Sequence, residues 1–239
     1  MKKLAFFVEG YSEVLFVEKL IGEIAEKNNV TIERGYIRGG KTIQKQLTVI
    51  NGKSASSACE YYVLILNCQG DHQVATRIAE EHRSFSGMGY EKLIGIRDVR
   101  PTFQHSDIPR LEATLRKGID QSLIPAEIIL SIMEIESVFL GEATHFERID
   151  PALTVDVIKS KLGFDPASGD MELRTEPAAD LANCYAIAGK TYTKQLVQDT
   201  IDVLDFDRIY LEQPQRFKSL SQLVSHIDSF LSPSVLRVG

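Results

Sequence analysis

The sequence predicts an α/β fold in which a mostly parallel sheet carries helices on both faces and a helical lobe follows. Up to about residue 150, short apolar runs alternate with segments of helical periodicity, and beyond that point only helical patterns occur. Strands that alternate with helices require crossover connections, which are right-handed and produce parallel strands covered on both faces. We therefore divide the chain into an α/β domain, residues 1–150, and a C-terminal helical lobe, residues 151–239, packed on it.

Five apolar runs are the expected strands, and each is short enough for a buried strand of a parallel sheet. They cover residues 4–8, 30–37, 61–66, 92–96 and 127–133. Helical spacing of apolar residues and the turn residues between the runs predict the helices. These cover residues 13–26, 42–50, 72–83 and 107–119, a short helix near Val138, and then residues 154–162, 179–189, 194–203 and 220–231, with a loop at 165–177.

The composition is that of an ordinary globular protein, with 44% hydrophobic and 25% charged residues in a chain of 239. A formal net charge of −6 excludes the strongly basic surface of a constitutive nucleic-acid binder. Any contact with nucleic acid must therefore be local.

The three cysteines are widely separated and form no CxxC pair, which indicates reduced thiols rather than a zinc site or a disulfide framework. The apolar run at the N-terminus is interrupted by Glu9, too early for a signal peptide or a membrane span. We expect a cytoplasmic protein without a membrane-spanning segment.

Polar residues follow four of the predicted strands. They are Glu9–Gly10, the stretch 67–71 (Asn-Cys-Gln-Gly-Asp), Arg97–Asp98 and the stretch 134–136 (Glu-Ile-Glu). Ligands of open parallel sheets bind at the carboxyl ends of the strands. Carboxylates gathered at that edge would repel one another unless a cation neutralised them, and oxygen ligands without cysteine or clustered histidine favour Mg²⁺ or Mn²⁺.

The run Phe-Phe-Val-Glu-Gly-Tyr-Ser-Glu, residues 6–13, resembles the opening Val-Glu-Gly-x-Ser/Thr-Glu/Asp of Toprim domains, especially OLD-type nucleases and related phage-defence proteins. The resemblance covers about residues 4–142. It implies a Toprim/Rossmann-like sheet and a site that gathers Mg²⁺ for phosphodiester cleavage. In that family the glutamate after the first strand, matched here by Glu9, and an Asp-x-Asp after a later strand hold the metal.

Asp98 matches the first aspartate of the second element, but Arg100 stands in place of the second. Either Glu134 or Glu136 supplies the missing oxygen, or the site binds metal weakly, or it is no longer catalytic; we favour Glu136 as the substitute. The resemblance thus implies a catalytic set of Glu9, Asp98 and Glu136, and a metal-binding set of Glu9, Glu13, Asp98, Glu134 and Glu136.

Simpler interpretations compete with this one. Glu9 and Glu13 could be a loop residue and a first-turn glutamate favoured by the helix dipole. Asp98 could be a turn residue or an ion-pair partner of Arg97 or Arg100.

Phosphate contacts are expected from Arg38, Lys41, Arg97 and Arg100. Arg38 and Lys41 flank the glycine pair at 39–40, where basic groups could grip a phosphate backbone without making the whole protein basic, and the planar guanidinium of Arg100 suits a phosphate clamp beside the metal. A solvated face is the alternative for such a grouping. A second and weaker set lies in the helical lobe. It comprises Lys190, Lys194, Arg216 and Lys218, with Tyr185, Tyr192 and Phe217 among them.

The resemblance implies a Toprim-like metal-dependent nuclease, or a nuclease-like effector, that acts on DNA or RNA, with a role in defence against phage. The alternative is a non-catalytic binding or regulatory module for a phosphate, a nucleotide or a protein partner. A phosphotransferase is disfavoured, because neither GxGxxG nor GxxxxGK[ST] occurs. We expect nucleic acid as the ligand, a protein partner within a defence system, no membrane contact, and we leave a homodimer open.

Overall fold

The computed structural model describes residues 1–25, 28–38, 46–50, 59–70, 73–99, 103–117, 119–120, 122–131 and 134–232. Lys41 and Arg100, two of the expected phosphate contacts, lie outside these ranges, as do Asp71 and Met133.

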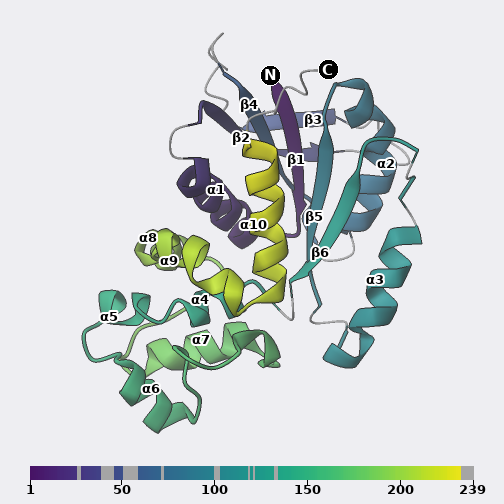
Figure 1. The fold of residues 1–239 in the computed structure, drawn as a ribbon. Coiled ribbons are helices and arrows are strands. Elements are labelled where there is room, and N and C mark those ends of the chain that lie inside the picture. The colour runs from purple at the N-terminus through teal and green to yellow at the C-terminus, as the bar shows by residue number, and fades with distance from the viewer. Residues whose placement is uncertain are drawn as a thin grey trace.

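A six-stranded sheet forms the centre of the molecule and confirms the predicted α/β class (Figure 1). The strands are β1 (Lys2–Val8), β2 (Val30–Arg38), β3 (Gln46–Ile50), β4 (Tyr61–Asn67), β5 (Lys92–Asp98) and β6 (Ala126–Ser131). Their order is β3-β2-β4-β1-β5-β6, and all neighbouring pairs are parallel except β2 and β3. The N-terminal strand is therefore central, with β4 on one side and β5 on the other.

The helix expected at 42–50 is wrong over its described part, because Gln46–Ile50 is strand β3. This segment pairs antiparallel with β2, from Arg34 opposite Ile50 to Arg38 opposite Gln46. Thr48, Val49 and Ile50 are β-branched, and such residues fit a pleated sheet surface better than a helix. Residues 42–45 lie outside the described ranges.

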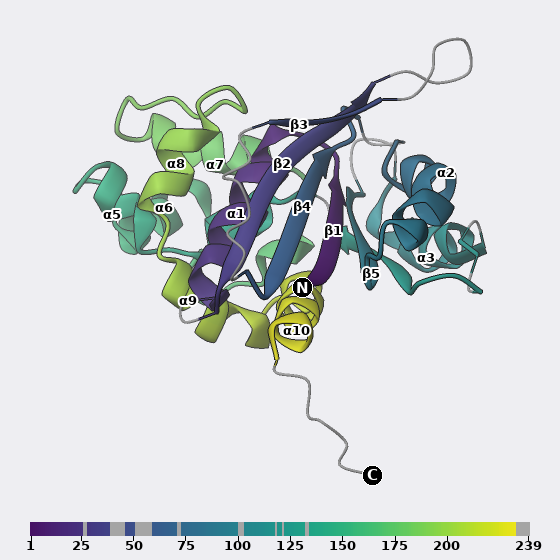
Figure 2. The same ribbon diagram turned by 90° about the horizontal axis from the view of Figure 1, so that it is seen from above.

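Side chains of β1 alternate between two hydrophobic clusters, as a strand covered on both faces requires. Leu4, Phe6 and Val8 pack with helix α1 (Tyr11–Ala25), whereas Ala5 and Phe7 pack with α2 (Gln73–Gly87). Figure 2 shows α2 and α3 (Ile108–Lys117) on one side of the sheet and α1 with the lobe on the other. The central strands β1, β4 and β5 are thus buried on both faces, whereas β3 is mostly exposed.

The remaining helices, from α4 onward, are called the lobe from here on, so this lobe begins before the boundary expected at residue 150. They are α4 (Glu136–Gly141), α5 (His145–Ile149), α6 (Val155–Leu162), α7 (Pro177–Ala186), α8 (Val197–Val203), α9 (Phe206–Leu211) and α10 (Lys218–Leu231). The sequence does not predict α5 or α9, which are five and six residues long. Helices α8, α9 and α10 contact α1, so the lobe shares the hydrophobic cluster of that face.

No helix in the described part of the chain is both long enough and apolar enough to cross a membrane.

Candidate active site

Glu9 lies directly after the central strand, between the carboxyl ends of β4 and β5. Its backbone carbonyl accepts a hydrogen bond from the N–H of Gly70 at 3.0 Å, and its Oε1 accepts one from the N–H of Asp98, also at 3.0 Å. The side chain is buried. The parallel pairing of β1 with both neighbours therefore holds Glu9 beside the end of β5.

Glu13 belongs to the first turn of α1 and folds back on the turn that follows β1. Its Oε2 accepts a hydrogen bond from the N–H of Gly10 at 2.9 Å. A Cβ at position 10 would lie 3.2 Å from that oxygen, so glycine allows the close approach. Burial raises the pKa of Glu13, its bond with Gly10 lowers it in part, and the charge of Glu136 raises it further.

Asp98 ends β5 and is almost completely buried, with 5% of its surface exposed. No described group hydrogen-bonds to its Oδ1 atom. Burial raises the pKa of this carboxyl well above its usual value, and the charges of Glu13, Glu9 and Glu136 raise it further. Asp98 is therefore a carboxylate surrounded by other carboxylates.

Glu136, the first residue of α4, brings the lobe into the same site. Its Oε1 accepts a hydrogen bond from the hydroxyl of Tyr192 at 2.7 Å, while no described group hydrogen-bonds to Oε2. Burial raises the pKa of Glu136, and Lys194 and Tyr192 partly oppose that effect. The side chain is fully buried.

Lys194 is the cation of the cluster, and it lies in the exposed loop between α7 and α8. Burial lowers its pKa, but Glu136, Asp98, Glu13 and Glu134 together outweigh this effect, so its pKa is raised. Lys194 makes no ion pair with any residue that the structure describes. Its ammonium group thus acts on the whole cluster without being bound to one carboxylate, which suits it to meet an anion.

Glu134 takes a different position from Glu136. Its Oε2 accepts a hydrogen bond from the N–H of Ala178 in the first turn of α7, at 3.0 Å. Residues two apart share a face on a strand but diverge where a helix begins. Glu134 therefore caps a lobe helix and lies at the margin of the cluster, where it still raises the pKa of Lys194.

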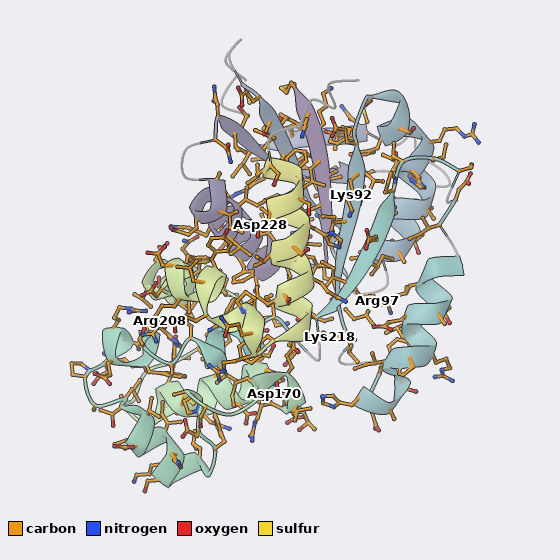
Figure 3. All side chains as sticks on the ribbon, viewed as in Figure 1. Lys92, Arg97, Asp170, Arg208, Lys218 and Asp228 are labelled. Carbon is orange, nitrogen blue, oxygen red and sulfur yellow. The ribbon has the colours of Figure 1, made fainter. Side chains whose placement is uncertain are left out.

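Of the expected phosphate-binding residues, the structure describes Arg97 and Arg38, and neither makes a described contact with the carboxylates. Arg97 precedes Asp98 on β5 and so points to the opposite face of the sheet, where its guanidinium lies 5.5 Å from the ring centre of Phe103. Figure 3 shows Arg97 and Lys92 at opposite ends of this strand. Arg38 ends β2 at the same sheet edge as Glu9 and is exposed, with its guanidinium 4.8 Å from the ring centre of Tyr36.

Sequence reasoning placed Lys194 and Tyr192 only in a weak basic and aromatic set of the lobe. The structure separates that set: Lys190 pairs with Asp150, whereas Arg216 donates to backbone carbonyls. What distinguishes Lys194 is its position just before α8, in a loop that returns to the sheet edge. Because that return depends on tertiary packing, no local sequence signal predicts it.

Cys68 lies beside Glu9 but is not prepared for nucleophilic attack. It is buried, and burial raises the pKa of its thiol to about 12, with a further contribution from the charge of Glu9. A thiol with such a pKa stays protonated near neutral pH and is a weak nucleophile.

The carboxylates fit a hard divalent cation in kind, because all donors are oxygen and two buried oxygens, Asp98 Oδ1 and Glu136 Oε2, have no described partner. Their positions, however, do not form a metal site: among the residues described, no three His, Cys, Asp or Glu side chains form a group that could hold a metal ion.

Comparisons with known proteins add no relative. No family model matches the chain, no curated protein matches it, and no solved structure matches it.

Proposed function

We propose that the chain is a Toprim-like nuclease whose reaction site is the carboxylate cluster Glu9, Glu13, Asp98 and Glu136, with Lys194 as its cation. One observation carries the proposal. Four buried carboxylates from three separate segments of the chain lie near the carboxyl edge of a parallel sheet, where such folds bind ligands, and Glu9, Glu13 and Glu136 are close enough to Asp98 to raise its pKa. Burial of several like charges is costly, and it is typical of functional sites rather than of stable cores.

We further propose Mg²⁺ or Mn²⁺ as the cofactor, held by Glu9, Glu13, Asp98 and Glu136 with Glu134 at the margin; because the described side chains form no group of three that could hold the ion, these carboxylates would have to move closer together to enclose it. When bound, such a metal would supply charge stabilisation and an activated water. The chain's own groups supply the rest. Lys194 would bind a phosphate oxygen, Asp98 presents an Oδ1 atom without a described hydrogen-bond partner, and the hydrogen bond from Tyr192 orients Glu136.

The substrate class follows from charge. An exposed lysine beside carboxylates would attract an anion, and a phosphodiester of DNA or RNA could bind there if a metal cation bridged it to the carboxylates. Arg38, at the same edge, would contact a neighbouring phosphate. The phage-defence role, a protein partner in such a system and a cytoplasmic location are proposed on the resemblance and on three buried free cysteines.

A second candidate is a metal-free binding module, and a specific observation favours it. The described carboxylates do not form a metal-holding group, and Lys194 already supplies a positive charge to them. In that case the cluster and Lys194 would bind a phosphate or nucleotide without cleaving it.

Cleavage of end-labelled single-stranded DNA and RNA by the pure chain, with Mg²⁺, Mn²⁺ or EDTA, tests the proposal. We expect metal-dependent cleavage that Glu9→Gln reduces by at least a hundredfold, because the change removes the charge and keeps the shape. Glu147→Gln, on an exposed face of α5, is the matched control and should cleave normally. Nucleic-acid binding without cleavage under every metal condition would support the second candidate and contradict the nuclease.

A further inference from the structure

Strand β6 is the outer strand of the sheet and leaves one backbone edge without a strand partner. It pairs in parallel with β5 and ends the strand order on that side. Exposed edges of sheets pair readily with another strand, so proteins usually cover or interrupt them. The groups that line the open edge of β6 therefore indicate what could bind there.

The hydrogen bonds identify which groups of β6 point outward. The N–H of Leu93 donates to the carbonyl of Pro125 at 2.9 Å, and the N–H of Val99 donates to the carbonyl of Ser131 at 3.3 Å. Since backbone groups of successive strand residues alternate in direction, the odd-numbered residues face β5. The N–H and C=O groups of Ala126, Ile128 and Leu130 therefore face outward, and within the described residues no hydrogen bond engages their outer side.

A groove of about 810 Å³ runs along this outer edge. Leu115 and Ile119 form an apolar wall on the α3 side, whereas Ser221 and Ser225 form a polar wall on α10. Figure 1 shows β6 at the margin of the sheet with α10 on one side and α3 on the other. The acids Glu112 and Glu127 line the groove, and Lys92 and His226 pair with Glu127.

We propose that this groove binds an extended segment of a partner protein as a seventh strand, by addition to β6. Two helices flank the edge, so a second copy, whose β6 lies between the same two walls, cannot bring its own edge into contact. An isolated extended segment can enter. Six residues, the length of β6, would span the edge at about 3.3 Å per residue.

The walls define the chemistry of the segment. Side chains of an added strand alternate between the two walls. Those facing Leu115 and Ile119 should be apolar. Those facing α10 should be polar, to match Ser221 and Ser225, and basic rather than acidic, because Glu127 on that side has about half of its side chain exposed and the chain carries a net charge of −6. A segment that alternates valine or isoleucine with lysine fits this pattern.

The test uses a fluorescently labelled hexapeptide of alternating valine and lysine, acetylated and amidated, with binding to the full chain followed by anisotropy. Two further peptides are N-methylated, one at every valine and one at every lysine. In an added strand, the N–H groups of either the valines or the lysines face β6, and those of the other residue type face away. Methylation of the set that faces β6 should lower the affinity at least tenfold, while the other methylated peptide should bind within twofold of the unmodified peptide. Equal binding of all three would show attraction by charge alone and would overturn the proposal.

Two variants exclude other occupants. Ser225→Trp fills the groove and should abolish binding, whereas Ser229→Trp, on α10 but outside the groove, should not. A chain ending at Ser232 should bind the peptide as the full chain does. A tenfold gain on truncation would assign the groove to residues 233–239, and a change of oligomeric state in Ser225→Trp would assign it to a second copy; either result would overturn the proposal.

Discussion

Asp98 illustrates how one residue can be costly for the fold and useful for the site. Its backbone N–H stabilises Glu9, while its own Oδ1 has no described partner and three carboxylates raise its pKa. A group of this kind destabilises the folded chain whenever it is charged. The cost is expected at a binding site and has no structural benefit in this fold.

We predict that Asp98→Asn raises the free energy of unfolding at pH 7 by about 1 kcal/mol. The change removes a repelled charge and leaves the backbone bond to Glu9 in place. Urea denaturation measures the effect, with Asp156→Asn, on an exposed turn of α6, as a control that should show no gain. Destabilisation by Asp98→Asn would mean that the charge is compensated in the wild-type chain.

The raised pKa of Asp98 also predicts how the free energy of unfolding depends on pH. A carboxyl whose pKa is higher in the folded than in the unfolded chain binds more protons when folded, so stability rises as pH falls through the folded pKa towards the usual value of about 4. We expect the wild type to be more resistant to urea at pH 5 than at pH 7, without added metal. The difference should shrink in Asp98→Asn, and an unchanged difference would assign the pH dependence to other groups.

If the proposed function holds, Lys194→Gln should weaken binding of single-stranded nucleic acid about tenfold, because it removes the cation that we propose contacts a phosphate. Lys190→Gln is the matched control, since Lys190 is four residues away and pairs with Asp150. Fluorescence anisotropy at fixed salt measures both. Equal affinities of the two variants would remove Lys194 from the site.

At the scale of elements, local patterns predict the strands well because each is a short apolar run. The five runs correspond to β1, β2, β4, β5 and β6 with small shifts at their ends. The signal was weaker at β3, an edge strand with exposed residues, and at the short helices α5 and α9, whose stability comes from tertiary packing. A glycine inside an apolar run, such as Gly95 in β5, does not show from the sequence alone that a helix packs closely against it.

Gly95 of β5 shows why that packing matters. A Cβ there would lie 2.8 Å from Ile78 and 2.9 Å from Val74, both on α2, so the helix approaches the strand closely because this residue has no side chain. We predict that Gly95→Ala lowers the free energy of unfolding by about 1 to 3 kcal/mol. Gly22→Ala in α1, with nothing within 4 Å, should instead stabilise by up to about 1 kcal/mol. Thermal denaturation compares them, and a neutral Gly95→Ala would contradict the tight packing.

At the scale of the whole molecule, the site exists because the lobe packs on the sheet. The sheet contributes Glu9 and Asp98, α1 contributes Glu13, and the lobe supplies Glu136, Tyr192 and Lys194. Strand ends could be predicted from the sequence, so the sheet carboxylates were among the candidates. The place of Lys194 could not, because about 60 residues separate it from Glu136 in sequence and only the folded lobe brings them together.

Anomalous diffraction from crystals of the chain soaked in Mn²⁺ tests the central claim most directly. We predict one manganese peak within bonding distance of oxygens from Glu9 and Asp98, with Glu136 or Glu13 completing the set, and no peak in Asp98→Asn crystals treated in the same way. An empty cluster at a Mn²⁺ concentration that supports cleavage, with the ammonium of Lys194 bound to the carboxylates, would contradict the claim that this cluster is the metal-dependent reaction site.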